Sequence, residues 1–212
     1  LELFSRVARR VEHIPNGVSL EGLPPRRQRD GGTFLYVGRL SRNKRVERLL
    51  EVFSSLRALI PDFRLYIVGG DFEGLLPGLR TRARELGLEE RVEFVGEKDR
   101  EGLLGYYSRA GFIVSASEYE GFGISILEGM AMGLVPILSD IRAHRELVEG
   151  GGGFLLDYSD AEGAAGAIAS IVVQDLAGVR ARARARAEKH DWREIVKRVE
   201  NIYQGALSKG EG

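Results

Sequence analysis

Residues 112–132 read Phe112-Ile113-Val114-Ser115-Ala116-Ser117-Glu118-Tyr119-Glu120-Gly121-Phe122-Gly123-Ile124-Ser125-Ile126-Leu127-Glu128-Gly129-Met130-Ala131-Met132. The first five residues are short, largely apolar and partly β-branched, which is typical of a buried strand. From Ile124 to Met132 the apolar residues recur with helical spacing, and Gly133 ends the predicted helix. Gly121 and Gly123 lie between the two elements, where a backbone must approach a ligand closely. This stretch therefore predicts a strand-to-helix junction that faces a ligand.

The chemistry of this junction favours a ligand that is both anionic and hydroxylated. Free N–H groups at the start of a helix, together with the positive end of its dipole, favour a phosphate. Glu120 and Glu128, with seven residues between them, would repel that phosphate unless they face other parts of the ligand. Sugar hydroxyls are natural partners for carboxylate acceptors. With 31 acidic residues this spacing is common by chance, so the evidence lies in the position of the pair at the junction. A phosphorylated sugar supplies both the anion and the hydroxyls.

Composition indicates a soluble globular domain. The 212 residues are 43% hydrophobic, enough for one sizeable core or two small ones, and the formal net charge is zero. No global field would recruit nucleic acid or an anionic membrane, and the absence of cysteine excludes disulfides, thiol nucleophiles and thiolate metal sites. No apolar run approaches membrane-spanning length. The amino end has neither a signal-peptide pattern nor an initiator methionine, so we expect a cytoplasmic chain that is part of something longer.

Strands and helices alternate along the middle of the chain. Short apolar segments predict strands at six places: Thr33 to Val37, Arg64 to Val68, Val92 to Val95, Phe112 to Ala116, Val135 to Leu138 and Phe154 to Leu156. The alternation predicts an α/β fold with a doubly wound, Rossmann-like parallel sheet of about six strands, flanking helices and a helical C-terminus. We divide the chain into a strap or linker (1–32), a ligand-binding domain (33–190) and a C-terminal helix (191–212).

Two helices show clear apolar stripes. The first is formed by Val46, Leu49, Leu50, Phe53, Leu56 and Ile60, and is expected to pack on the sheet. The last helix is predicted to begin at Asp191, with Glu194 completing a capping box. Its stripe comprises Trp192, Ile195, Val196, Val199, Ile202 and Tyr203, which is more than a terminal helix needs for itself. That helix either covers one edge of this domain or docks on a partner domain absent from the chain.

Ligands of open parallel sheets bind beyond the carboxyl ends of the strands. Arg39 follows the first predicted strand and Lys44 lies five residues later, so the two cations can reach one point above the sheet, as a diphosphate would require. As an alternative, both are ordinary solvated charges. Gly70 is either a ligand contact or part of a turn. The three histidines, His13, His144 and His190, are interpreted as structural.

Other anion sites do not fit. No lysine follows a glycine, which excludes the phosphate-binding P-loop, and the glycine spacing from Gly69 to Gly74 is wrong for a dinucleotide fingerprint. The chain also lacks an Asp-x-Asp pair and a clustered His/Asp set that would hold a divalent ion on a diphosphate. We therefore expect no metal and no separate cofactor, with the diphosphate charge met by cations and helix-start N–H groups.

With these motifs assembled, the chain resembles the carboxyl-terminal, donor-binding half of a retaining glycosyltransferase of the GT-B architecture, in the glycosyl transferases group 1 family. The similarity covers nearly all of the chain. It is carried by Ile14 to Val18, Tyr36 to Leu40 with Lys44, Val92 to Gly96, Glu120 to Glu128, Gly133 to Ile137, and the helix from Trp192 to Tyr203. Departures from the family pattern are Arg45 and Gly129, which stand where glycine and alanine are usual, and Gly70 before Asp71 in place of Gly-x-Gly.

The resemblance implies a role for each matching position. The diphosphate would be held by Gly38, Arg39 and Lys44, and its departure stabilised by the two cations. Glu120 would engage hydroxyls of the transferred sugar and is placed with Arg39 and Lys44 among the catalytic residues. Glu128 would hold the ribose, and Val95 and Gly96 would border the base. The remaining contacts to phosphate and sugar would come from the backbone of Gly70, Gly121, Phe122, Gly123 and Ile124.

The implied activity is retaining transfer of a hexosyl group, mannosyl or glucosyl, from a GDP- or UDP-sugar to a hydroxyl acceptor such as a polysaccharide or glycolipid. An acceptor-binding N-terminal domain would be missing here, so the isolated half is expected to bind donor and transfer little. The resemblance also allows peripheral association of the full-length protein with the inner face of the membrane. A nucleotide-sugar epimerase of related architecture and a non-catalytic nucleotide-sugar binding module are the alternatives.

Overall fold

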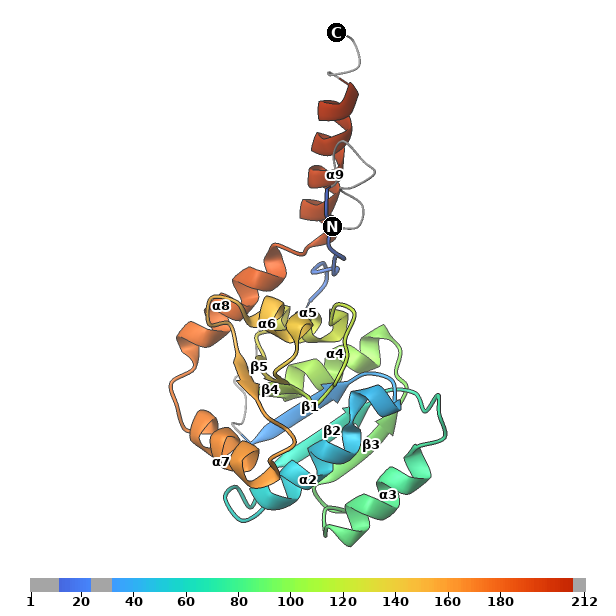
Figure 1. Cartoon of the computed structure of the whole chain (residues 1–212), viewed down its shortest axis with the longest axis vertical. Coiled ribbons are helices and arrows are strands. Elements are labelled where there is room, and N and C mark those ends of the chain that lie inside the picture. Colours follow the sequence, from blue (N-terminus) through green and yellow to red (C-terminus); the bar gives the residue numbers. More distant parts are fainter. Residues whose placement is uncertain (1–11, 24–31, 208–212) are drawn as a thin grey trace.

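A computed structural model describes residues 12–23 and 32–207 (Figure 1). The expectations for residues 1–11 and 24–31 of the strap and for residues 208–212 of the last helix lie outside the described residues. The strands are β1 (Thr33–Val37), β2 (Arg64–Val68), β3 (Val92–Gly96), β4 (Phe112–Ser115), β5 (Val135–Ser139) and β6 (Phe154–Leu156). The helices are the short η1 (Arg42–Lys44), α2 (Val46–Leu56), α3 (Leu76–Glu85), α4 (Arg100–Arg109), α5 (Ile124–Ala131), α6 (Arg142–Val148), α7 (Ala161–Val172), α8 (Ala177–Glu188) and α9 (Trp192–Leu207).

The six strands form one parallel sheet in the order β3-β2-β1-β4-β5-β6. This confirms the predicted doubly wound α/β fold, and each predicted strand lies within one residue of its expected bounds. The strand order reverses between β1 and β4, which are paired through Phe34 with Phe112 and Leu35 with Ile113. Because such a reversal opens a crevice at the carboxyl ends of the two strands, the topology places a ligand site there.

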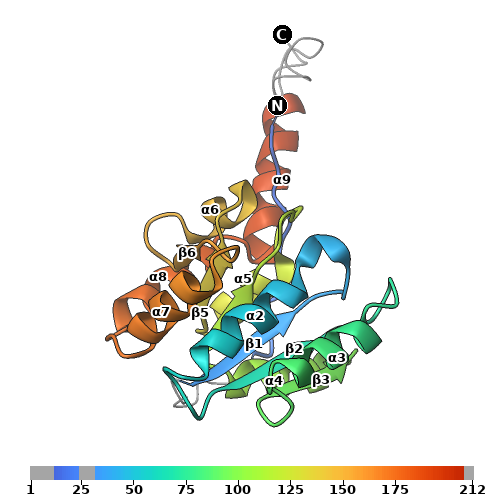
Figure 2. The same ribbon diagram turned by 60° about the horizontal axis from the view of Figure 1, so that its bottom comes forward.

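Helices cover both faces of the sheet (Figure 2). On one face α2, α3 and α7 pack on a cluster that contains Phe34, Phe53 and Phe112, whose rings contact one another at centroid distances of 4.9 and 5.1 Å. On the other face α4, α5, α6 and α8 pack on a cluster built around Leu35 and Ile113. The sheet is therefore the middle of three layers, and β4 and β5 are buried along their whole length.

Two details of the predicted helices are wrong. Helix α2 ends at Leu56, and the backbone N–H groups of Leu59 and Ile60 both donate to the Leu56 carbonyl, so Ile60 packs on the core from a turn after the helix. At the start of α9, Glu194 accepts from Lys197 Nζ at 2.8 Å, and the Asp191 N–H donates to Glu188. The hydrogen bond from the Asp191 N–H to the Glu194 side chain, which a capping box requires, is therefore not made.

The ends of β1 and β2 approach more closely than side chains allow. Gly69 has φ +150°, and a Cβ atom there would lie 1.9 Å from the Gly38 carbonyl oxygen. The neighbouring backbone bonds, from Gly38 N to Val68 O at 3.0 Å and from Leu40 N to Gly70 O at 2.8 Å, fix this approach. Packing alone therefore explains Gly69.

Helix α9 projects away from the body of the molecule (Figure 1). The described strap residues run beside its base, where Val18 accepts from Trp192 N at 3.1 Å and donates to His190 O at 2.7 Å. Ile195 is buried, whereas Trp192, Val196 and Tyr203 are exposed. The apolar stripe raised two possibilities, and one was that α9 covers an edge of this domain. Beyond its first turns, α9 therefore does not cover such an edge.

Candidate functional site

The predicted junction and the cations after β1 meet at the rim where the strand order reverses. The ammonium of Lys44, at the end of η1, forms an ion pair with the carboxylate of Glu120, which follows β4. The two side chains are only 13% and 19% exposed. A small polar cavity lined by Tyr36, Ser117 and Ser125 adjoins them. An ammonium and a carboxylate thus face each other in a partly desolvated place at the mouth of the sheet.

The backbone around this pair is joined by further contacts. Glu118 N donates to Asn43 O at 2.9 Å, and Asn43 Nδ2 donates to Tyr119 O at 3.2 Å. Arg45 Nε lies 2.8 Å from Glu118 Oε2, and its backbone is left-handed with φ 48°. Glycine adopts such a left-handed backbone without strain, and here an ion pair to Glu118 accompanies a non-glycine residue in that conformation.

Arg39 occupies a more exposed position than Lys44. Its guanidinium lies above the Phe72 ring, 5.7 Å from the centroid. Its carbonyl oxygen accepts a 2.9 Å hydrogen bond from the Tyr36 hydroxyl. Burial, and then the charge of Glu120, raise the pKa of Tyr36, while Arg39 opposes the rise. Arg39 and Glu120 therefore both act electrostatically on one hydroxyl, although the guanidinium is turned to Phe72 and not toward Lys44.

The start of α5 has the geometry expected of a ligand-facing helix end. Gly123 caps the helix in a left-handed conformation with φ 87°, and a Cβ atom there would lie 2.8 Å from Leu147 Cδ1. Gly121 is exposed, with open space around its Cα. The first N–H groups of a helix, here those of Ile124 and Ser125, have no partners inside it and can bind an anion. Phe122 points back to the body and packs edge to face on His190 at 5.5 Å.

Glu128 lies on α5, one helical turn beyond the junction. Its Oε2 is 3.0 Å from the Tyr107 hydroxyl of α4, and the same hydroxyl is 2.8 Å from the Ser125 carbonyl. Burial, and then the charge of Glu128, raise the pKa of Tyr107 well above its usual value, so this hydroxyl remains a donor. Tyr107 therefore positions the Glu128 carboxylate.

Four further predicted residues lie at the ends of β1, β2 and β3. A Cβ atom at Gly38 would lie 2.9 Å from the Tyr36 hydroxyl, and one at Gly70 would lie 2.9 Å from the Phe72 ring. Gly96 ends β3 with φ 77°, and its carbonyl accepts from Gly69 N at 3.0 Å. Val95 packs on the second core cluster. These residues thus share the rim with Arg39, and their contacts with a ligand stay predictions.

His144 lies buried next to this site. Its Nδ1 is 2.9 Å from the Ser139 carbonyl oxygen, which can only accept, so Nδ1 carries the proton. Nε2 is buried and has no hydrogen-bond partner among the described residues. Burial lowers the pKa of His144, with Lys44 acting in the same direction and Glu120 and the Ser139 bond opposing it. The imidazole is therefore neutral at pH 7, which agrees with a structural role.

An open cavity of about 390 Å³ extends from Glu120. It lies between the β4–α5 junction and the start of α6, and is lined by Tyr119, Gly121, Ile141 and Ala143 among others. This volume falls within the range of small-molecule sites. Among the described residues, no three His, Cys, Asp or Glu side chains cluster as metal ligands would. Within the same residues no single helix is long and apolar enough to span a membrane, and α7 and α8 pass that test only as a pair bent by 101°.

Sequence reasoning assigned no role to three residues of the rim: Tyr36, Phe72 and Tyr107. Tyr36 lies in the buried part of β1, and Tyr107 is the buried residue of the largely polar helix α4. Their contacts, to Arg39 and to Glu128, depend on how the elements meet. The one available signal was the tyrosine hydroxyl itself, since a buried tyrosine hydroxyl usually has a partner.

Comparisons with known proteins agree with this geometry. The family model described as glycosyl transferases group 1 matches residues 25–190. A GDP-mannose:cellobiosyl-diphosphopolyprenol alpha-mannosyltransferase of Xanthomonas campestris is 33% identical over 213 residues, which cover 97% of this chain and 56% of that protein. A phosphatidyl-myo-inositol mannosyltransferase of Mycolicibacterium smegmatis is 32% identical over 218 residues, 93% of this chain and 52% of that protein. The chain thus spans about half the length of these curated relatives.

Solved structures give the same fold. Sucrose-phosphate synthase of Thermosynechococcus elongatus is 29% identical and aligns with a TM-score of 0.74 over 92% of this chain and 52% of its own. HepE of Anabaena, solved with UDP and glucose, aligns with a TM-score of 0.71 at 23% identity, over 84% of this chain and 48% of its own. The second likeness concerns the fold alone. The family match covers the whole sheet and the rim, and the chain belongs to the glycosyl transferases group 1 family.

Proposed function

We propose that this chain is the donor-binding half of a retaining glycosyltransferase and that its rim binds a nucleotide diphosphate sugar. The observation that carries the proposal is the Lys44–Glu120 pair, which sets a cation for phosphate and a carboxylate for sugar hydroxyls beside the amino end of α5. The cavity beyond Glu120 has room for a hexose. The alternatives, an epimerase and a non-catalytic binding module, find no support in the relatives described above.

We propose GDP-mannose as the donor. Both curated relatives described above are named mannosyltransferases, and the name of the Xanthomonas protein includes GDP-mannose. The structures that contain UDP are less similar in sequence, at 23% identity for HepE. A glycogen synthase of Mycobacterium tuberculosis, 32% identical over 99% of this chain, keeps a glucosyl donor as the other possibility.

In the proposed reaction, the bond between the anomeric carbon and the β-phosphate oxygen breaks, and a bond to the acceptor hydroxyl oxygen forms on the same face of the sugar. Arg39 and Lys44 stabilise the charge of the departing diphosphate, and Glu120 holds sugar hydroxyls. The departing phosphate takes the acceptor proton. Preorganised charge of this kind contributes about 10²–10³ in rate for each group.

The acceptor is proposed to bind between this half and a second domain. The exposed stripe of α9 supports this arrangement, since Trp192, Val196 and Tyr203 are exposed apolar side chains on this helix. Alone, the chain would bind the donor and transfer little sugar. Location in the cytoplasm and peripheral association with the inner face of the membrane stay predictions.

A thermal-shift comparison of GDP, UDP and ADP on this chain tests the proposal. A ligand at one hundred times its dissociation constant adds about 2.7 kcal/mol to the free energy of unfolding. We expect GDP to raise the melting temperature more than UDP and ADP do. A larger shift with UDP would overturn the choice of base, and no shift with any of the three would contradict the donor site itself.

A further inference from the structure

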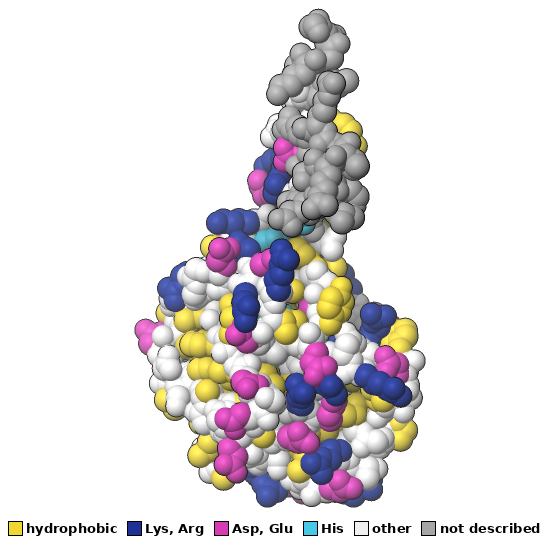
Figure 3. Space-filling view, viewed as in Figure 1, with side chains coloured by type: hydrophobic (Ala, Val, Ile, Leu, Met, Phe, Trp, Pro, Cys, Tyr) yellow, Lys and Arg dark blue, Asp and Glu magenta, His cyan; other side chains and the backbone are white. Residues whose placement is uncertain are grey.

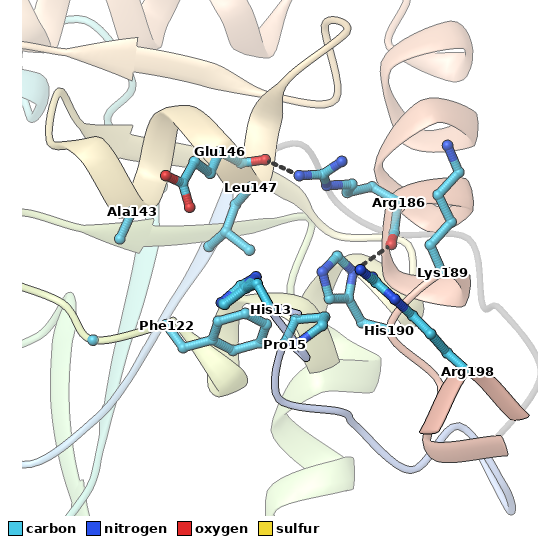
Figure 4. A pocket seen from close by; sticks show the side chains of 11 residues that line it. His13, Pro15, Phe122, Ala143, Glu146, Leu147, Arg186, Lys189, His190 and Arg198 are labelled. Carbon is cyan, nitrogen blue, oxygen red and sulfur yellow. Dashed lines mark hydrogen bonds between the residues drawn. The ribbon is translucent and has the colours of Figure 1, made fainter. Parts of the chain in front are cut away.

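A second cavity, of about 380 Å³, lies between the strap, α6 and the α8–α9 junction (Figure 4). The chain segments that form it are far apart in sequence, and no motif in the sequence indicated it. Among the described residues, its ionisable lining consists of His13, Glu146, Arg186, Lys189, His190 and Arg198. In Figure 3 histidine and basic side chains gather near the base of the projecting part of the molecule. We refer to this cavity as the basic pocket.

Among the described residues, the basic pocket carries more positive than negative charge. Its three cationic side chains lie near one lining carboxylate, Glu146, which is already paired with Arg142 at 3.0 Å. One cation, Arg186, is paired with Glu149 outside the lining, whereas no hydrogen bond or ion pair is described for the side chains of Lys189 and Arg198 within residues 12–23 and 32–207. A cavity with two such cations favours an anion.

Arg186 is held in place by a neutral group. Its Nη2 donates to the Glu146 carbonyl oxygen at 2.5 Å, which fixes the guanidinium beside α6 without removing its charge (Figure 4). The nearest carboxylate, that of Glu149, is 3.6 Å from Nη1, and Nε is buried without a partner among the described residues. Arginine fixed in this way presents a preorganised fork for phosphate oxygens.

His190 lies in the same positive environment. Its Nδ1 is 2.9 Å from the Arg186 carbonyl oxygen, and its ring contacts Phe122 of the β4–α5 junction. Burial lowers the pKa of His190, the bond to the Arg186 carbonyl opposes this, and the charges of Arg186 and Lys189 lower the pKa further. An anion in the basic pocket would relieve that repulsion.

The basic pocket adjoins the cavity that extends from Glu120. The two share Gly121, Ala143 and Glu146 in their linings. We propose that the basic pocket binds a phosphate group of the acceptor substrate and thereby directs the acceptor hydroxyl toward the sugar held at Glu120. This inference rests on the proposed function. A phosphate ester or diphosphate fits better than a carboxylate because it carries more charge, about −2 for a monoester, and has oxygens enough for several cations.

Inorganic pyrophosphate is the probe for the test, with the donor site blocked by saturating GDP. The chain has three histidines, so their imidazole NMR signals are few enough to assign. We expect saturable shifts of His13 and His190 and no shift of His144. Lys189→Gln with Arg198→Gln is expected to weaken pyrophosphate binding about tenfold or more, as the loss of two charges near 4 Å implies. The affinity for GDP is expected to stay within about twofold.

Arg184→Gln with Lys197→Gln is the matched control. Arg184 lies on α8 and Lys197 on α9, and they are paired with Glu188 and Glu194 outside the basic pocket. Their substitution removes the same amount of charge as the first double variant. We expect the control to bind pyrophosphate as the unchanged chain does. Equal weakening in both double variants, unmoved His190 signals, or no saturable binding at millimolar pyrophosphate would each overturn the proposal.

Arg39→Ala separates this inference from the proposed function. It is expected to bind GDP about tenfold or more weakly and to keep the pyrophosphate response of His190. If GDP fails to bind the unchanged chain, the proposed donor site is contradicted. The shifts of the His13 and His190 signals still show whether the basic pocket binds pyrophosphate. Glucose 1-phosphate and farnesyl diphosphate then distinguish two sources of the phosphate: tighter binding of the first indicates a soluble sugar phosphate, and tighter binding of the second indicates a lipid-linked diphosphate.

Discussion

Lys44 and Glu120 are 76 residues apart in the chain, and their side chains form an ion pair at the carboxyl edge of the sheet. The pair joins the turn after β1 to the junction after β4, which are the two strand ends that flank the reversal of strand order. Each group holds the other in place, and in the proposed function a ligand with a phosphate and hydroxyls would engage both. Five predictions start from this and from neighbouring contacts.

Removal of either partner is expected to be more costly than removal of both. Lys44→Ala leaves a partly buried carboxylate without its cation and should lower the free energy of unfolding by about 1–3 kcal/mol. Glu120→Gln should cost less, because an amide still accepts from the ammonium. A double-mutant cycle in urea measures the coupling, which we expect to be about 1 kcal/mol or more. Additive effects of the two substitutions would contradict the pair.

Arg39→Ala is expected to affect binding and to leave stability nearly unchanged. The guanidinium is exposed and lies over the face of Phe72, a cation–π contact worth about 0.5–1 kcal/mol at such a site. Loss of a charge-assisted bond to diphosphate should weaken GDP binding about tenfold or more. Calorimetric titration checks this, with Arg42→Ala as the control, since Arg42 is 86% exposed and faces Glu73. Equal weakening of GDP binding by the two substitutions would show that the overall positive charge, and not a direct contact of Arg39, is responsible.

Tyr107→Phe tests how Glu128 is positioned. We expect loss of the hydroxyl to cost about 1–2 kcal/mol of stability, because the buried carbonyl of Ser125 and the Glu128 carboxylate lose their shared donor. GDP and 2′,3′-dideoxy-GDP should bind to Tyr107→Phe and to Glu128→Gln with similar affinity, whereas the unchanged chain should prefer GDP. Full preference for GDP in Glu128→Gln would remove this carboxylate from ribose binding.

Stability is expected to fall in mild acid because of His144. Its pKa is lowered in the folded chain, so the unfolded chain binds the additional proton. The free energy of unfolding should therefore decrease as the pH falls below about 6.5 and level off below the folded pKa, with a slope of at most about 1.4 kcal/mol per pH unit. Urea unfolding of His144→Asn and of the control His13→Gln checks the sign. A slope that His144→Asn leaves unchanged would assign the effect to another group, such as His190, whose pKa is also lowered.

Gly69→Ala is expected to be strongly destabilising. The new Cβ atom would lie 1.9 Å from the Gly38 carbonyl oxygen, a backbone atom that neighbouring hydrogen bonds hold in place, so about 2 kcal/mol or more should be lost. Gly105→Ala in α4, where nothing lies within 4 Å, should instead add about 0.5–1 kcal/mol. Chemical denaturation of the two variants compares them, and similar stabilities would contradict the close approach of β1 and β2.

The sequence was sufficient for the sheet and for the position of the rim. Hydrophobic runs of strand length identify β1 to β6, most clearly β4 and β5, which are buried throughout, and parallel strands end at one edge. Three features were not predictable in this way: the direction of Arg39 toward Phe72, the contact of Tyr107 with Glu128, and the basic pocket. Each depends on the angle at which two elements distant in sequence meet, and periodicity within one element carries no information about that angle.

The bonds of Val18 on both sides of Asp191 have a mechanical consequence. Because Val18 donates to His190 O and accepts from Trp192 N, the strap and the base of α9 are tied into one two-stranded tether. A displacement of the strap or of the base of α9 would reach the β4–α5 junction through the ring of His190, which packs against Phe122. In the proposed two-domain enzyme, rotation of the second domain about this tether would therefore displace the β4–α5 junction.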